Sequence, residues 1–216
     1  MIKAVIFDLD GLLIDSEPLW YKSQNQVLEQ YGKSFTLQDY VASYAGRTVK
    51  ENAKHLVDEY DLPVSHEEAW KQLLVFSEEN NKNVPLKNGG KELIDYLVEN
   101  NYKISLGSSS ARQRAVDILK NDGVLDKFDT LITSENVKNG KPDPEIFLAA
   151  AKSLGLKPEE CLVLEDAKAG VEAAYRGNIP AIFVPDLKQA DDEVRAKTIC
   201  VLDSLHDVIT YLKENN

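Results

Sequence analysis

Helical and strand-like segments alternate from residue 91 onward, and this alternation constrains the fold more than any other feature of the sequence. Short apolar runs predict strands, and the amphipathic stretches between them predict helices. The predicted strands are 102–106, 128–133, 161–164 and 179–184, and the predicted helices are 91–99, 112–119, 144–155, 167–176 and 204–212. Because helices connect successive strands, we predict an α/β fold in which helices cover both faces of a parallel sheet.

The chain also opens with an apolar run, residues 4–7, which predicts a buried strand of the same sheet. The run ends in Asp8, Leu9, Asp10 and Gly11. Two carboxylates at this spacing lie on one side of an extended chain, and bringing them together is unfavourable unless a cation or a proton lies between them. Gly11 allows a sharp turn at this point. Taken alone, the pattern is more typical of a strand that ends in an Asp-Gly turn than of a catalytic site.

Between this first strand and the alternating region, the sequence is helical in character. Thr36 with Asp39 and Thr48 with Glu51 have the spacing of capping boxes, and no convincing strand pattern is present. The polar stretch 81–90 contains a proline and two glycines, which is typical of a connection. We therefore predict a helical domain at 16–81, inserted into a core made of 1–15 and 82–216.

Charge and cysteine content limit the possible partners. The 216 residues carry a formal net charge of −11, which argues against nucleic acid or an anionic membrane as a partner. Cys161 and Cys200 lie in apolar, strand-like contexts and resemble buried thiols of a reducing compartment. The N-terminal run lacks a basic flank and ends in acids, so it resembles neither a signal peptide nor a membrane span. We expect a cytoplasmic monomer.

Polar clusters follow four of the predicted strands. In chain order, the clusters are Asp8 with Asp10, Gly107 with Ser108, Ser109 and Ser110, Lys141 with its neighbours to Pro144, and Glu165 with Asp166. Because the carboxyl ends of parallel strands meet at one edge of a sheet, we expect these clusters to converge there. Ser110 with Gln113 is also a possible capping box at the start of the helix that follows.

These clusters resemble the four motifs of the haloacid dehalogenase (HAD) superfamily. The similar segments are FDLDG at 7–11, the serine at 108, GKPDP at 140–144 and LEDAKAG at 164–170, in the order and spacing of the family. The helical insert resembles the cap of the β-phosphoglucomutase-like branch. The resemblance covers nearly the whole chain and implies a HAD-like, Rossmann-like core with an inserted α-helical cap domain.

The resemblance also implies a reaction, namely phosphoryl transfer through an aspartyl-phosphate. Asp8 would be the nucleophile, and Asp10 would act as general acid toward the leaving oxygen and then as base toward water. Lys141 would supply positive charge beside Asp8. Ser108, with the main-chain N–H groups of Ser109 and Ser110, would hold phosphate at a helix start. Dehalogenases and phosphonatases of the superfamily lack a carboxylate at the position of Asp10, so its presence favours transfer on oxygen.

Magnesium is the implied cofactor, because the available ligands are hard oxygens. Asp8, the backbone carbonyl of Asp10 and the carboxylate of Asp166 would hold it, with Glu165 nearby. In the cap, Gly46 and Arg47 occupy the positions at which the cap loop of this branch contacts the substrate. Arg47 is equally well explained as a surface arginine beside a helix start.

Three functions are compatible with these motifs. The favoured one is a Mg²⁺-dependent phosphatase that hydrolyses a small phosphomonoester such as a sugar phosphate. The second is a hexose-phosphate mutase, but Trp20 and Val49 occupy the positions where β-phosphoglucomutases carry a histidine and a cap-loop arginine. The third is a non-catalytic binding or regulatory relative, whose signature would be a lost motif residue, and none is lost here.

Overall fold

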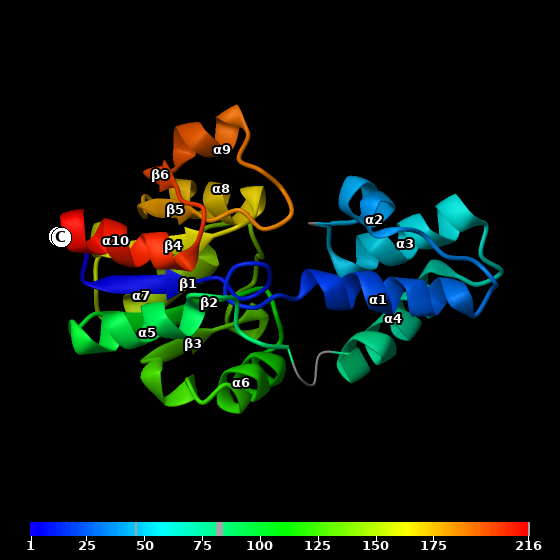
Figure 1. The fold of residues 1–216 in the computed structure, drawn as a ribbon, viewed down its shortest axis with the longest axis horizontal. Coiled ribbons are helices and arrows are strands. Elements are labelled where there is room, and N and C mark those ends of the chain that lie inside the picture. The colour runs from blue at the N-terminus through cyan, green and yellow to red at the C-terminus, as the bar shows by residue number, and fades with distance from the viewer. Residues whose placement is uncertain (46, 81–83, 216) are drawn as a thin grey trace. The chain divides into compact units, whose positions relative to one another are not determined.

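The structure, a computed structural model, describes residues 1–45, 47–80 and 84–215. The chain divides into two compact units (Figure 1), one formed by Met1–Asp15 with Pro85–Asn216 and the other by Ser16–Val84. The boundary predicted at residue 82 lies outside the described residues. Within the described part of the chain, every helix is too short or too polar to cross a bilayer.

The first unit contains a six-stranded sheet (Figure 1). Its strands are β1 (Ala4–Phe7), β2 (Lys103–Gly107), β3 (Thr130–Ile132), β4 (Cys161–Glu165), β5 (Ala181–Phe183) and β6 (Cys200–Val201). The order is β3-β2-β1-β4-β5-β6 and every neighbouring pair is parallel. The predicted parallel α/β fold is confirmed, although β6 was not predicted. The order reverses at β1, so the carboxyl end of β1 is the topological switch point, where sheets of this kind bind ligands.

Helices cover this sheet on both sides. They are α5 (Gly90–Glu99), α6 (Arg112–Asn121), α7 (Glu145–Ser153), α8 (Lys168–Arg176), α9 (Asp192–Lys197) and α10 (Leu205–Asn215), with short 3-10 turns η2 (Leu125–Lys127), η3 (Ser134–Asn136) and η4 (Pro158–Glu160). Helices α7 and α8 pack on the face that carries Ile6 and Val163, and Phe147 and Ala174 complete this cluster. Helix α5 contacts α10 and β2, and Figure 1 shows α5 and α10 in front of the sheet.

The second unit is helical, with α1 (Glu17–Glu29), α2 (Leu37–Ser43), α3 (Val49–Tyr60) and α4 (His66–Asn80). The capping boxes predicted at Thr36 and Thr48 are both confirmed, because each hydroxyl accepts from an N–H three residues on. Asn25 exchanges two hydrogen bonds with the backbone of Phe35, at 3.0 and 3.1 Å, inside the aromatic core of this unit. None of its described residues forms a strand.

Some predicted boundaries are wrong in physically simple ways. The strand predicted at 128–133 is shorter, because Phe128 is the C-cap of η2 and Thr133 is the N-cap of η3. The capping box predicted at Ser110 does not form, since Ala111 is the N-cap of α6.

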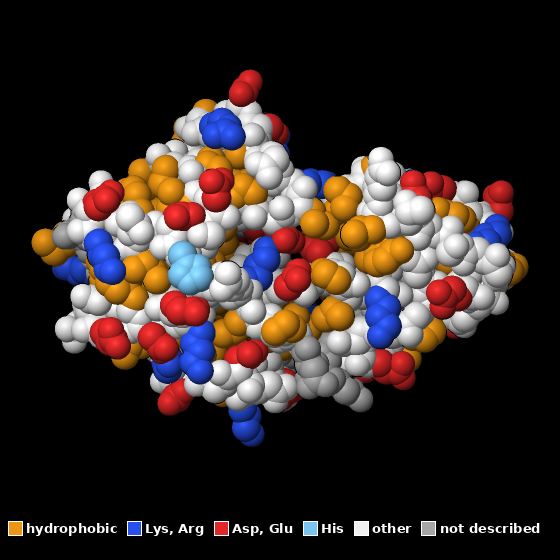
Figure 2. Space-filling model, in the orientation of Figure 1, with side chains coloured by type: hydrophobic (Ala, Val, Ile, Leu, Met, Phe, Trp, Pro, Cys, Tyr) orange, Lys and Arg blue, Asp and Glu red, His pale blue; other side chains and the backbone are white. Residues whose placement is uncertain are grey.

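Cys161 and Cys200 are both free thiols, and Cys161 is buried. On the face shown in Figure 2, lysine and arginine side chains are scattered among acidic ones.

Gly107, the last residue of β2, tests how tightly α7 packs on the sheet. A Cβ at this position would lie 2.9 Å from Phe147 Cδ1 and 3.1 Å from Ile6 Cγ2, both in the buried core. We predict that Gly107→Ala lowers the free energy of unfolding by about 1–3 kcal/mol, because the core must shift to admit the methyl group. Urea-induced unfolding measures this change.

Gly140→Ala is the matched control, because a Cβ there would meet nothing within 4 Å. It should change stability by no more than about 0.5 kcal/mol. Equal stability of the two variants would contradict the packing described here.

Candidate active site

The candidate site lies at the carboxyl edge of the sheet, around the end of β1. Phe7 is in register with Leu106 of β2 and with Leu164 of β4, so the residues that follow these strands leave the sheet side by side. The Asp8 N–H donates to Leu164 O at 3.1 Å, and the Ser108 N–H donates to Ile132 O at 3.0 Å. The backbone of both residues is therefore held by the sheet itself.

The ammonium of Lys141 lies between two carboxylates. It donates to Asp8 Oδ1 and, at 2.7 Å, to Glu165 Oε1. The side chains of Lys141 and Asp8 are each 10% exposed and that of Glu165 is 1% exposed. The ammonium also lies 4.7 Å from the ring centroid of Phe147, a favourable cation–π distance. The structure therefore places Lys141 against the predicted nucleophile, in a site largely shielded from water.

Glu165 holds this lysine in place. Its second oxygen, Oε2, accepts from the N–H groups of Asp166, at 3.0 Å, and Ala167, at 2.9 Å. A Cβ at Gly170 would lie 1.6 Å from Glu165 Oε1, so α8 can pass the carboxylate only with glycine at that position. No role was predicted for Gly170, although a glycine inside a predicted helix is a signal of close packing.

Asp166 lies close to Gly11, in the turn of the first motif. A Cβ at Gly11 would lie 2.2 Å from Asp166 Oδ2, and Gly11 also has a φ of +84°. Glycine is thus required here both for backbone conformation and for space. Asp166 Oδ1 is buried and has no hydrogen-bond partner among the described residues. A buried, unsatisfied carboxylate oxygen is costly, which marks it as a binding position for a cation.

The negative charge of this cluster exceeds its positive charge. Oxygen atoms of Asp8, Glu165 and Asp166 all lie within 4.8 Å of one another. Burial raises the pKa of Asp8 to about 7, and the charge of Glu165 adds to the rise while Lys141 opposes it. Burial, with the charges of Glu165 and Asp8, also raises the pKa of Asp166 well above its usual value. Burial alone would lower the pKa of Lys141, but its two carboxylate partners outweigh this effect and raise it.

The donor set therefore fits a divalent cation. Each of the three carboxylates offers a hard oxygen, and Mg²⁺ is held by such ligands. The unpartnered Asp166 Oδ1 is the observation that supports this fit most directly. Glu165 differs from the other two, because its oxygens already accept from Lys141 and from two backbone N–H groups.

Asp10 is held by Arg114, a residue for which no role was predicted. Arg114 donates from Nη2 to Asp10 Oδ1 at 2.6 Å and from Nη1 to Asp10 Oδ2 at 2.8 Å. Ser110 Oγ donates to the same Oδ2 at 2.5 Å. This contact explains why Ser110 does not cap α6. The only sequence signal for Arg114 was a basic residue in the first turn of the helix after the serine motif.

The serine motif has an internal hydrogen bond in this structure. The Ser110 N–H, expected to contact phosphate, donates to Ser108 Oγ at 3.1 Å. Ser108 is 1% exposed, whereas Ser109 is exposed.

Lys87 is a second residue that sequence reasoning missed. It lies in the predicted connection, and its Nζ donates to Gly11 O and to Asp186 Oδ1, each at 2.5 Å. Asp186 follows β5 and its charge contributes to the raised pKa of Asp166. Lys87 thus links the turn of the first motif to the loop after β5.

Two further residues, Gly46 and Arg47, were predicted to contact substrate from the cap. Arg47 belongs to the second unit, where it is exposed and its N–H donates to Tyr44 O at 3.3 Å. Gly46 lies outside the described residues. A substrate-binding role for either residue stays a prediction.

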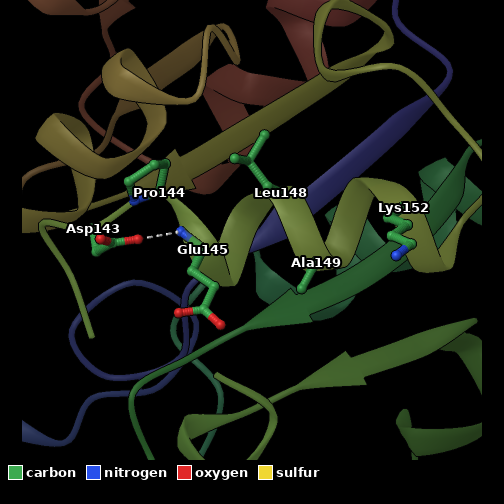
Figure 3. A pocket seen from close by; sticks show the side chains of 6 residues that line it. All are labelled: Asp143, Pro144, Glu145, Leu148, Ala149 and Lys152. Carbon is green, nitrogen blue, oxygen red and sulfur yellow. Dashed lines mark hydrogen bonds between the residues drawn. The ribbon is translucent and has the colours of Figure 1, made fainter. Parts of the chain in front are cut away.

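A separate cavity of about 460 Å³ lies beside α7 (Figure 3). Its lining residues are Asp143, Pro144, Glu145, Leu148, Ala149 and Lys152. Figure 3 shows Asp143 accepting a hydrogen bond from the N–H of Glu145, at 3.0 Å, where α7 begins. None of the charged residues clustered around Asp8 lines it, so this cavity is not the candidate site.

Comparison with known proteins agrees with the arrangement of these motifs. The family model described as haloacid dehalogenase-like hydrolase matches residues 5–184. A phosphorylated carbohydrates phosphatase of Thermotoga maritima is 32% identical over 220 residues, and the match covers 99% of each chain. A β-phosphoglucomutase of Bacillus subtilis is 29% identical over 217 residues, covering 95% of each chain.

Among solved structures, a β-phosphoglucomutase from Clostridium difficile has a TM-score of 0.78 at 27% identity. The match covers 99% of this chain and 96% of that one. The chain therefore belongs to the haloacid dehalogenase-like hydrolase family, in which it is an enzyme of the phosphatase type.

Proposed function

We propose that the protein is a Mg²⁺-dependent phosphatase that hydrolyses a small phosphorylated carbohydrate through an aspartyl-phosphate on Asp8. The observation that carries this proposal is the Lys141 ammonium held against Asp8, with Asp166 in the same cluster. The substrate class is supported by the Thermotoga maritima relative, which is named a phosphatase of phosphorylated carbohydrates.

In the first half-reaction, an oxygen of Asp8 attacks phosphorus and the bond to the leaving oxygen breaks. Repulsion between one pair of unit negative charges at ~4 Å is roughly 4 kcal/mol at an effective dielectric constant of ~20. Uncompensated, this repulsion would slow the reaction by about three orders of magnitude. Lys141 lowers it by placing its positive charge beside Asp8. Mg²⁺, held by Asp8, Asp166 and the carbonyl of Asp10, would supply further charge neutralisation on the phosphoryl oxygens.

The other motif residues have supporting roles in this proposal. Asp10 donates a proton to the leaving oxygen and then accepts one from the water that hydrolyses the intermediate. Ser108 and the backbone of Ser109 hold the phosphoryl group at the start of the serine motif. Glu165 orients Lys141 and lies beside the metal ligands. The helical unit is the proposed cap domain, with Arg47 and Gly46 as its proposed substrate contacts.

A mutase is the second candidate, because a β-phosphoglucomutase is 29% identical over nearly the whole chain. A mutase protects its phospho-aspartate from water between half-reactions, whereas a phosphatase admits water. Incubation with glucose 1-phosphate, with and without a hexose bisphosphate, separates the two. We predict release of inorganic phosphate in both mixtures. Conversion to glucose 6-phosphate without release of phosphate would instead establish the mutase.

The nucleophile is tested by Asp8→Asn. We predict that this variant keeps its fold but loses at least about three orders of magnitude in the hydrolysis of p-nitrophenyl phosphate, because an amide oxygen is a poor nucleophile. Circular dichroism and release of nitrophenol measure the two properties. Asp203→Asn, an exposed residue away from the motifs, is the control and should retain full activity. Full activity of the Asp8 variant would exclude the proposed intermediate.

Metal dependence is tested by binding as well as by activity. Removing divalent cations with a chelator should abolish turnover, and restoring Mg²⁺ should recover it. At 100 times its dissociation constant, Mg²⁺ should stabilise the wild-type protein by about 2.7 kcal/mol, because it binds the folded cluster. Thermal unfolding measures this gain. Asp166→Asn should weaken Mg²⁺ binding at least about tenfold, since it replaces a charged carboxylate ligand with a neutral amide. Undiminished binding would remove Asp166 from the proposed site.

A further inference from the structure

Arg114 and Asp10 form the only contact between two charged side chains that joins the first motif to α6 among the described residues. The guanidinium binds the carboxylate through two parallel N–H···O bonds, 2.6 and 2.8 Å long. This fork geometry fixes the plane of a carboxylate more firmly than a single donor can.

A hydroxyl completes the arrangement. Ser110 Oγ donates to Asp10 Oδ2 and accepts from Arg114 Nη1 at 2.6 Å. The Ser110 N–H donates to Ser108 Oγ, which ties this group to the end of β2. The side chains of Arg114 and Asp10 are 20% and 29% exposed, so the pair is partly shielded from solvent. Asp10 is therefore held by α6, through Arg114, and by the loop between β2 and α6, through Ser110.

We propose that Arg114 is a positioning residue for the second half-reaction, in which it orients Asp10 to accept a proton from the attacking water. This inference rests on the proposed phosphatase function. In that step water attacks the phosphorus of the aspartyl-phosphate, and its proton passes to an oxygen of Asp10. The bond between phosphorus and the Asp8 oxygen then breaks, releasing inorganic phosphate and regenerating the Asp8 carboxylate.

The two half-reactions depend on Asp10 to different degrees. A substrate whose leaving group is a stable anion needs little protonation, so its first half-reaction proceeds without a well-placed acid. The second half-reaction is the same for every substrate, and water always needs a base. With such a substrate, loss of the Arg114 contact should therefore slow only hydrolysis of the intermediate.

The test is rapid-quench kinetics with 2,4-dinitrophenyl phosphate and Mg²⁺. We expect Arg114→Gln to form the phosphoenzyme at a rate within about threefold of wild type and to hydrolyse it at least about tenfold more slowly. The variant should then release dinitrophenol in a burst and accumulate phosphoenzyme. Arg114→Lys, which keeps the charge but not the fork, should lie between the two.

Arg112→Gln is the matched control. Arg112 lies on the same helix, is exposed, and donates from its side chain to the backbone oxygen of Leu131 at 2.9 Å. This variant should hydrolyse the phosphoenzyme at the wild-type rate. A double variant of Asp10→Asn with Arg114→Gln should be no slower than Asp10→Asn alone, because Arg114 acts through Asp10.

Three results would overturn the inference, and they are distinguishable. Hydrolysis of the phosphoenzyme at the wild-type rate in Arg114→Gln would show that Asp10 does not need this contact. Equal slowing of both half-reactions would show a general structural role. If even Asp10→Asn traps no phosphoenzyme, the covalent route of the proposed function fails, and the inference fails with it.

Discussion

A lysine ammonium buried between two carboxylates is the interaction on which the rest of the site depends. Lys141 contacts Asp8 and Glu165 where all three side chains are at most 10% exposed. Charges removed from water to this extent are unfavourable unless each finds a partner, and removing one member of such a group typically costs ~3–5 kcal/mol. Three elements that are distant in sequence must therefore meet here, the ends of β1 and β4 and the loop before α7.

Close approach of backbone to carboxylate is the second constraint. Gly11 and Gly170 each leave room for an acidic side chain, and a methyl group at either position would lie at most 2.2 Å from a carboxylate oxygen. These glycines let Asp166 and Glu165 gather beside Asp8 without moving the strands. The resulting excess of negative charge leaves Asp166 Oδ1 unpartnered and creates the demand for a cation. An acidic protein can in this way direct its own carboxylate toward a phosphate.

A second layer of polar and charged side chains binds the residues that flank this cluster. Arg114 and Ser110 hold Asp10, while Lys87 holds the carbonyl of Gly11 and the carboxylate of Asp186. The positive charges of this layer lie beside acidic groups of the first motif and of the loop after β5. Arg114 and Lys87 thereby orient the turn that carries Asp10.

The sequence by itself determined the parallel α/β fold and the placement of the motif residues after β1, β2 and β4, because alternating periodicities and turn residues are local signals. Both capping boxes of the helical unit were also predictable from spacing alone. Only the tertiary structure decided that Arg114 binds Asp10, that Ser110 turns away from capping α6, and that Gly170 must make room for Glu165. Those contacts join residues 5 to 104 positions apart, or depend on a space too small for a Cβ, and no local pattern records either.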